Sequence, residues 1–459
     1  MAFSPNASGG RTATVRGFFV HSATGNIRAH PLRPTTRPLR SIVTSHRTEP
    51  LTDAKTATKA SPHPVIFLIL CLPFGAASGY LVVTLGYLLR QAGVGVLDIA
   101  WLVSLSFWPQ VLKFLWAPVV DTTLTSKRWY FLAAIASGLT LVAMGLYHPS
   151  PATFGMLTAL VLLNNIAISF LGMAAENLMA HGASDTEKGR AGGWYQAGNL
   201  GGQGIGGGAA LWIAQHTVIS WLPGASMGAL FLACCLALLF VNEPEMGHRH
   251  LNYAKSIGNV LKDVWQSALS RVGLLALLIC FLPIGSGAAS GLWSSVAGDW
   301  HASADTVALV NGVLGGVMSI FGSLIGGYLC DRMNRQFGYA LFGVFLSVVT
   351  LAMMAAARTP TMFVVFTLGY AFVQGFNYAS FSAVVLEAIG RGAAATKYNV
   401  YACLSNIPLL YMTAYEGKAY DKWHANGLLG ADALSGLAGV AIFALVALVL
   451  FPRRAPAPA

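Results

Sequence analysis

Charged residues are scarce in this sequence, at 10% of 459 residues, whereas soluble domains average about 25%. So few charges cannot cover the surface of an ordinary soluble enzyme. A hydrophobic content of 55% and a mean hydropathy of +0.61 also exclude a disordered chain. Fifty glycines lie among long apolar runs, a pattern typical of membrane helices whose backbones approach closely. The composition therefore predicts an integral membrane protein.

Several catalytic motifs are absent as well. The six cysteines are scattered through apolar runs without CxxC or metal spacing, as expected of small core residues. No HExxH or HxxxxD motif occurs, and GNLGGQGIGGG at 198–208 is not a phosphate loop because no Lys-Ser/Thr follows it. These absences argue against ATP drive and against a membrane-embedded enzyme such as an acyltransferase, the alternative of a different class. We expect no metal, no cofactor and no enzymatic activity.

The formal net charge of +11 is concentrated at the start of the chain. Residues 1–63 contain nine Lys/Arg and two acids, or +7, which leaves +4 for the rest. This segment has no sustained apolar period and is expected to be a disordered basic tail, either an organellar transit peptide or an over-extended reading frame. No nucleic-acid-binding domain is predicted.

Apolar segments long enough to cross a bilayer core of about 30 Å begin at residue 64. We expect an all-α protein with twelve spans, at 64–89, 97–120, 128–148, 152–180, 191–214, 219–241, 271–297, 304–330, 337–357, 361–387, 396–416 and 433–452. The polar stretch 242–270 divides them six and six, into an N-terminal bundle (64–241) and a C-terminal bundle (271–454) joined by a linker. Fourteen Lys/Arg lie in one set of connections and four in the other, so both termini and the linker are predicted to be cytoplasmic.

The two halves of the chain repeat. LPFGAASGY at 72–80 matches LPIGSGAASGL at 282–292, with Pro73 and Pro283 210 residues apart. Asp121 and Asp331 are also 210 apart, and Glu176 and Glu387 are 211 apart. A parallel duplication of six spans predicts two pseudo-symmetric bundles, the architecture of major facilitator transporters, with a substrate site between the halves.

The loop sequence GGYLCDRMNR at 326–335 resembles the loop motif of the major facilitator family. The resemblance implies a charge latch at the cytoplasmic side, formed by Asp331, Arg332 and Arg335, with Asp121 as the first-half equivalent. Ordinary helix-end charges are the alternative interpretation.

More specific motifs narrow the family. FWPQVLKFLWAPVVD at 107–121, YLLRQAGV and DTEKGRAGGWYQAGNLGG at 185–202 resemble the AmpG-type muropeptide permeases and the related acetyl-CoA transporter branch. The resemblance implies a proton-driven importer of anhydro-muropeptides in a bacterial inner membrane; some relatives import siderophores. AmpG-type permeases usually carry acidic residues in the middle of span four, where this chain has Glu176 and then Asn177.

Ionisable residues inside spans are costly and need a reason. Lys113 is either a partner for an anionic substrate or charge, or a lysine that snorkels to the surface. Glu176 is a candidate for proton coupling or a helix-end partner for Lys188 or Arg190, and Glu387 has the same two interpretations with Arg391 as its partner. Glu416, near the outer end of span eleven, is assigned to an outer gate or interface.

Polar and aromatic side chains of spans one, four, seven and ten are candidates for a substrate cavity. Aromatic rings suit sugar faces and amides suit hydroxyl and peptide groups, whereas helix–helix hydrogen bonds are the alternative for each residue. Together with Lys113, the candidates are Tyr80, Thr84, Tyr87, Asn164, Asn165, Ser290, Trp293, Gln374, Asn377 and Tyr378.

Small-xxx-small pairs at Gly202/Gly206, Gly312/Gly316 and Gly322/Gly326 predict close packing of spans five and eight across the interface between the halves. The sequence as a whole predicts an alternating-access, proton-coupled permease that acts as a monomer. Its expected partners are the bilayer, protons and a small solute, either a sugar-peptide or another amphiphilic molecule such as a siderophore.

Overall fold

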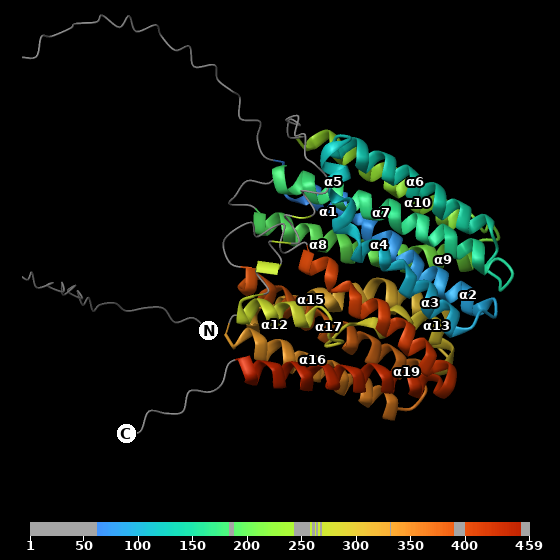
Figure 1. Cartoon of the computed structure of the whole chain (residues 1–459). Coiled ribbons are helices and arrows are strands. Elements are labelled where there is room, and N and C mark those ends of the chain that lie inside the picture. The colour runs from blue at the N-terminus through green and yellow to red at the C-terminus, as the bar shows by residue number, and fades with distance from the viewer. Residues whose placement is uncertain are drawn as a thin grey trace, which may run out of the picture. The chain divides into compact units, whose positions relative to one another are not determined.

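The computed structural model describes residues 62–182, 188–242, 258, 262, 265–266, 269–330, 332–389 and 400–450. Within these residues every regular element is helical. The chain divides into two compact units, 1–58 and 59–459, and the described residues belong to the second. Figure 1 shows α1 beginning and α19 ending at the same end of the helices, as an even number of spans requires. We call this end the predicted cytoplasmic end.

The first half comprises the segments of six predicted spans. Its elements are α1 (Val65–Gly79), η1 (Tyr80–Leu85), α2 (Gly86–Gln91), α3 (Val96–Ser106), α4 (Trp108–Val111), α5 (Lys113–Thr122), α6 (Ser126–Leu146), α7 (Phe154–Gly182), α8 (Lys188–Gly204), η2 (Ile205–Ala209), α9 (Ala210–His216), α10 (Leu222–Cys234) and η3 (Cys235–Phe240). Spans one, two and five are each built from consecutive short helices.

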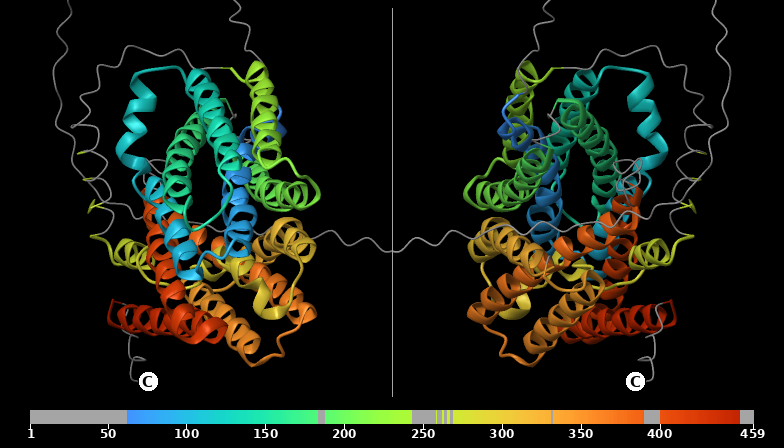
Figure 2. Two further views of the ribbon diagram at one scale, coloured as in Figure 1. Left: turned by 90° about the vertical axis from the view of Figure 1, so that its right-hand side faces the viewer. Right: turned by 90° about the vertical axis from the view of Figure 1, so that its left-hand side faces the viewer.

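The second half follows the same order. Its elements are α12 (Arg271–Ile279), η4 (Ala288–Gly291), α13 (Trp293–Val296), η5 (Ala297–Trp300), α14 (Ala304–Val307), η6 (Ala308–Leu314), α15 (Gly315–Cys330), α16 (Arg335–Ala355), α17 (Pro360–Ile389) and α19 (Asn406–Leu450). In α19, Trp423 and His424 have non-helical backbone angles, so it consists of two helices joined at a kink. Figure 2 shows the helices of the two halves gathered on opposite sides of this unit.

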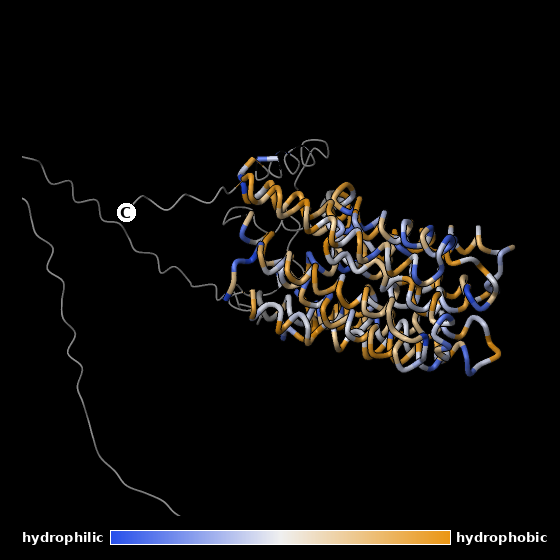
Figure 3. Tube along the Cα trace, turned by 90° about the horizontal axis from the view of Figure 1, so that it is seen from below, coloured by the Kyte–Doolittle hydropathy of each residue, from blue (hydrophilic) through white to orange (hydrophobic). Residues whose placement is uncertain are grey.

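Over the described residues the predicted spans fall on helical segments, except that 280–287 of the seventh is not helical; 396–399 of the eleventh lies outside the described residues. Nine of the described helices are long and apolar enough to cross a membrane, and the ninth, Val400–Leu450, contains both helices of the kinked pair. The fifth and seventh predicted spans are not among these nine helices. The fifth is rich in glycine, and the seventh is unwound between α12 and η4. The hydropathy of the trace follows the same pattern, with apolar residues along the helices and polar residues mainly at their ends (Figure 3).

The duplication is visible in matching contacts. Tyr130 on α6 donates a hydrogen bond to the carbonyl of Leu70 (2.9 Å), and Tyr339 on α16 donates one to the carbonyl of Ile284 (3.1 Å). The two tyrosines are 209 residues apart and bind the first and seventh spans, respectively. Each half thus uses a tyrosine of its third span to bind the backbone of its first span, although the acceptor carbonyls, Leu70 and Ile284, are 214 residues apart.

The repeated motif nevertheless has two backbone conformations. In the first half it continues as helix through Pro73, whereas residues 282–287 of the second half form no helix, with left-handed φ angles of +57° at Gly285 and +75° at Gly287. Irregular backbone at membrane depth must find its hydrogen bonds inside the protein. Tyr339 supplies one of them, to Ile284.

The glycine pairs do not all lie where the sequence predicted. A Cβ on Gly202 or Gly206 would collide with the backbone of α1, so these residues pack within the first half. The opposite face of this helix packs against the second half, because Gly204 and Gly208 lie against Gly312. A helix of glycines has two small faces, and spacing alone does not show which one meets which neighbour.

The Gly322/Gly326 pair was also expected at the interface, and it too lies elsewhere. Added Cβ atoms there would meet the backbone of Phe372 and Phe376 on α17, within the second half. Only Gly312 and Gly316 of the predicted pairs face the other half, where Gly316 approaches Leu200.

Candidate functional site

Lys113 and Glu176 form a two-pronged ion pair inside the first half. The Lys113 Nζ donates hydrogen bonds of 2.6 and 2.7 Å to the two carboxylate oxygens of Glu176. Their side chains are 15% and 28% exposed. Lys113 is the first residue of α5, directly after the break at Leu112, and Glu176 lies on α7. The two ionisable residues that the sequence singled out separately are therefore partners.

The surroundings of the pair are closely packed and mostly apolar. Gly172 lies one turn before Glu176, and a Cβ there would stand 3.1 Å from the Phe74 ring and 3.9 Å from the Lys113 Nζ. Glu176 acts electrostatically on the thiol of Cys71 on α1 and on the hydroxyl of Tyr195 on α8. Four spans, the first, second, fourth and fifth, thus meet at this point.

The KFLWAP motif holds α5 against α7 at two points. Trp116, one turn after Lys113, donates its Nε1–H to the Oγ of Ser169 (3.2 Å) and stacks on Phe170 with a centroid distance of 6.4 Å. Ser169 and Glu176 are seven residues apart, hence two turns along the same face of α7. The motif therefore has an architectural role alongside the charge of Lys113.

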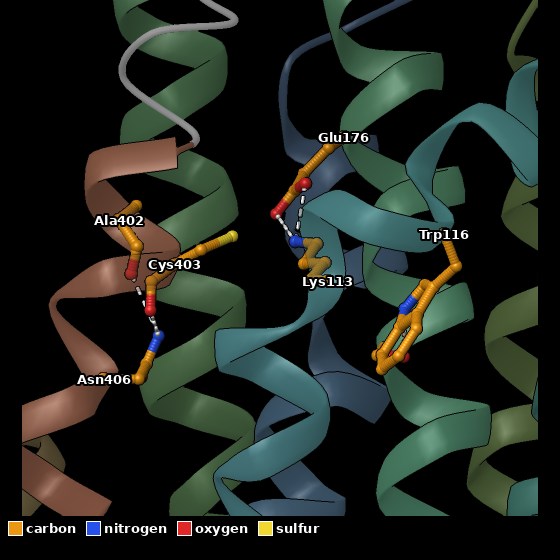
Figure 4. Close-up of polar contacts among 7 residues, drawn as sticks. Lys113, Trp116, Glu176, Ala402, Cys403 and Asn406 are labelled. Atoms are coloured by element: carbon orange, nitrogen blue, oxygen red, sulfur yellow. Dashed lines mark hydrogen bonds and ion pairs between the residues drawn. The ribbon is translucent and has the colours of Figure 1, made fainter. Parts of the chain in front are cut away.

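The second half reaches the pair through Cys403. Its thiol points toward Lys113 and Glu176 (Figure 4), and both charges act electrostatically on it. Asn406, one turn further, donates to the carbonyl of Ala402 (2.9 Å) of its own helix. The ion pair of the first half thus faces the eleventh span.

The predicted latch is described only in part. Asp331 and Arg391 lie outside the described residues, and the side chains of Asp121, Lys188 and Arg190 are likewise not described.

Two latch residues can be placed. The guanidinium of Arg332 stacks over the ring of Tyr328 at 4.0 Å. Arg335 approaches Glu387 to 3.7 Å, with both side chains more than 40% exposed. An exposed pair of this kind is worth little free energy, so Glu387 has the environment of a helix-end partner.

The candidates of span one point in different directions. Tyr80 is buried in the core of the first half, and the Thr84 hydroxyl is shared by the carbonyls of Gly206 (3.0 Å) and Gly207 (3.2 Å) in η2. Tyr87 packs on a core that is formed mainly by the second half. Thr84 thus joins spans one and five, and Tyr87 lies at the contact between the halves.

The two asparagines of span four serve helix packing. The Asn164 amide donates to the hydroxyls of Ser137 and Thr140, both at 2.8 Å, and Asn165 donates to the carbonyl of Val161 on its own helix (3.0 Å). The structure thus gives both amides the helix-packing contacts that the sequence left as the alternative.

Spans seven and ten bring their candidates together around the unwound segment. A Cβ on Gly287 would lie 1.7 Å from the Gln374 amide, and one on Gly285 would lie 2.4 Å from the Asn377 amide. Gln374 donates to the hydroxyl of Tyr378 (3.0 Å), which is on the same helix and 46% exposed. Ser290 donates to the carbonyl of Gly287 (2.6 Å).

Two buried polar atoms in this region have no partner within the described chain. They are the Nε1–H of Trp293, whose residue is 3% exposed, and the Oδ1 of Asn377, whose residue is 2% exposed. Buried polar groups without a bond are rare and call for an explanation. The unwound segment with its surrounding amides is the second part of the candidate site.

Sequence reasoning missed Cys403 and Asp432. Cys403 lies in an apolar segment with no motif, so only the packing of span eleven reveals it. Asp432 was placed in a loop because span twelve was expected to begin at 433, whereas the second helix of α19 already begins beside the kink at His424. A search for acids within eight residues of a predicted hairpin turn would have found it.

Similarity to known proteins agrees with this architecture. Residues 66–410 match the Major Facilitator Superfamily. The chain is 22% identical over 354 residues to the putative transporter AmpG 4 of Rickettsia conorii, covering 73% of this chain and 84% of that protein. It is 24% identical over 380 residues to the anhydromuropeptide permease of Escherichia coli K12, covering 78% and 74%, respectively.

Solved transporters have the same fold at low sequence identity. The nucleoside transporter NupG superposes with a TM-score of 0.65 at 12% identity, covering 83% of this chain and 99% of that one. A POT family transporter in complex with a thioalcohol-conjugated peptide gives 0.64 at 10% identity and coverages of 84% and 96%. The family match spans both halves of the chain and agrees with the repeat and the helix order, and the protein is a multi-pass membrane protein of the major facilitator superfamily.

Proposed function

We propose that this protein is a proton-coupled importer of a muropeptide-like solute in a bacterial inner membrane, with both termini in the cytoplasm. The observation that carries the proposal is the Lys113–Glu176 ion pair, which lies among four spans and faces Cys403 of the second half. The similarity to the anhydromuropeptide permease supports the choice of solute.

A half-buried ion pair can couple a proton to a carboxylate-bearing substrate. When Glu176 accepts a proton it becomes neutral, and Lys113 then lacks its counter-charge in a poorly hydrated place. A carboxylate of the incoming peptide can replace it. Proton and substrate therefore favour each other's binding, which is the thermodynamic requirement for symport.

Spans seven and ten would hold the rest of the solute. The free Nε1–H of Trp293 and the free Oδ1 of Asn377 offer a donor and an acceptor, and the exposed ring of Tyr378 offers an apolar face. These are the groups that sugar hydroxyls, peptide amides and sugar faces require.

Uptake of a labelled anhydromuropeptide into proteoliposomes tests the solute. Saturable uptake that excess unlabelled anhydromuropeptide suppresses, and that a ferric siderophore leaves unchanged, would support the proposal. No uptake of anhydromuropeptide, together with uptake of a labelled ferric siderophore, would overturn the choice of solute.

A further inference from the structure

The two helices of α19 form a tight antiparallel pair with an acid on each. They are joined at Trp423 and His424, and a Cβ on Gly427 would lie 2.1 Å from the carbonyl oxygen of Ala419. Glu416 and Asp432 stand eight residues before and eight residues after His424, which is about 12 Å along each helix. The hairpin therefore places the two carboxyl groups at the same depth, facing each other.

Both acids are buried, and their hydrogen bonds are unequal. Glu416 is 0% exposed and Asp432 is 6% exposed. Asp432 accepts hydrogen bonds from the Thr350 hydroxyl (2.8 Å) on α16 and from the Tyr370 hydroxyl (3.3 Å) on α17. Within the described chain, neither carboxyl oxygen of Glu416 has a hydrogen-bond partner, and Asp432 is the neighbouring acid that acts electrostatically on it.

A buried carboxylate is expensive unless hydrogen-bond donors solvate it, and two neighbouring carboxylates in a low-dielectric interior would also repel each other. The hydroxyls of Thr350 and Tyr370 satisfy one carboxylate, that of Asp432. Glu416 is buried and has no donor at either oxygen, so it is the acid that keeps its proton.

The neighbouring charges leave this assignment intact. One turn after Glu416, the hydroxyl of Tyr420 donates to Asp299 (3.0 Å). The guanidinium of Arg90 donates to the carbonyl of Val94 (3.4 Å) and is engaged there.

The remaining charged groups on these elements lie at the surface. On α19 itself Lys418, Asp421 and Lys422 are exposed, and on the adjoining α3 Asp98 is exposed. In the described part of the chain no basic side chain forms an ion pair with Glu416 or Asp432.

We propose that Glu416 and Asp432 form a proton-binding site in the second half, and that the proton it holds is one of those coupled to transport. The coupling of this proton to transport rests on the proposed symport function. In the arrangement seen here Glu416 holds the proton. When the halves rearrange and water enters, the proton passes from Glu416 to water, and the two carboxylates left behind become hydrated.

A contact links this site to the candidate substrate region. The ring of Trp293, in span seven beside the unwound segment, meets Tyr370 edge-on with a centroid distance of 5.4 Å. Tyr370 in turn donates to Asp432. A movement of span seven on substrate binding would therefore alter the hydrogen bond that stabilises the Asp432 carboxylate.

Infrared spectroscopy of the purified full-length protein tests the proton site without any substrate. The wild-type protein at neutral pH is expected to show a protonated carboxyl band that shifts in D₂O, and Glu416→Gln should remove it. Asp421→Asn, at an exposed acid on the same helix, is the matched control and should retain it. A band unchanged in both Glu416→Gln and Asp432→Asn would overturn the proposal.

Transport then tests the coupling. A pH difference of about one unit supports about tenfold accumulation per coupled proton. Glu416→Gln should therefore accumulate anhydromuropeptide about tenfold less than wild type while substrate exchange across the membrane continues. Undiminished accumulation would overturn the coupling role. If wild-type protein moves no anhydromuropeptide, the proposed function fails, and the infrared band still decides the proton site.

Discussion

At the scale of single residues, Lys113 and Glu176 each supply the charge that the other needs. Sequence analysis singled out both, because charges within apolar spans are rare. It could not pair them, because the residues are 63 positions apart and the contact depends on how α5 and α7 pack. The alternative partners considered for Glu176 were Lys188 and Arg190, whose side chains lie outside the described part of the structure.

Removing one partner should be worse than removing both. Lys113→Met leaves the Glu176 carboxylate without a partner, and Glu176→Gln leaves the Lys113 ammonium without a counter-charge. Each change is expected to lower the free energy of unfolding by an amount on the order of 3 kcal/mol. The double variant should recover much of the lost thermal stability, measured as Tm in detergent. Lys422→Met, at an exposed lysine, should leave Tm unchanged. Additive losses in the double variant would show that the two residues do not interact.

At the scale of helices, the sequence predicted where spans lie better than how they face one another. Apolar length identified the nine described helices that are long and apolar enough to cross a membrane, because burial in lipid demands it of a span. Which face of a glycine-rich helix meets which neighbour could not be predicted in this way. Gly202, Gly204, Gly206 and Gly208 offer small surfaces on two faces. Only the packed structure shows that α1 takes one face and the second half takes the other.

A methyl group distinguishes these faces experimentally. Gly206→Ala should lower Tm, because its Cβ would lie 1.8 Å from the carbonyl oxygen of Ala76, an overpacking expected to cost about 1–3 kcal/mol. Gly201→Ala, five residues earlier with no atom within 4 Å of its Cβ, should be neutral or slightly stabilising. Equal Tm values for the two variants would contradict the close contact of α1 with η2.

At the scale of the whole molecule, the halves share a core. Val83, Ala100 and Leu211 of the first half pack with Trp293, Trp300 and Leu428 of the second. The internal repeat predicted two bundles, but a repeat contains no information on how its copies meet. The shared core lies toward the end opposite the predicted cytoplasmic end, so opening of that end would require this core to separate.

The orientation in the membrane follows from the bias of basic residues and can be tested by fusion. Alkaline phosphatase fused after Leu450 should be inactive, because it would remain in the cytoplasm. The same enzyme inserted between α16 and α17, beside Arg358, should be active. The reverse pattern would contradict cytoplasmic termini and would reassign the Lys113–Glu176 pair to the outer side.

Solute accumulation in proteoliposomes shows whether transport by this protein is coupled to protons. With an imposed pH gradient, acidic outside, the wild-type protein should concentrate labelled anhydromuropeptide above the external level, and a protonophore should reduce this to equilibration. Glu176→Gln should equilibrate the solute without concentrating it. Accumulation that persists with the protonophore, or uptake that never exceeds equilibration in the wild type, would contradict the account.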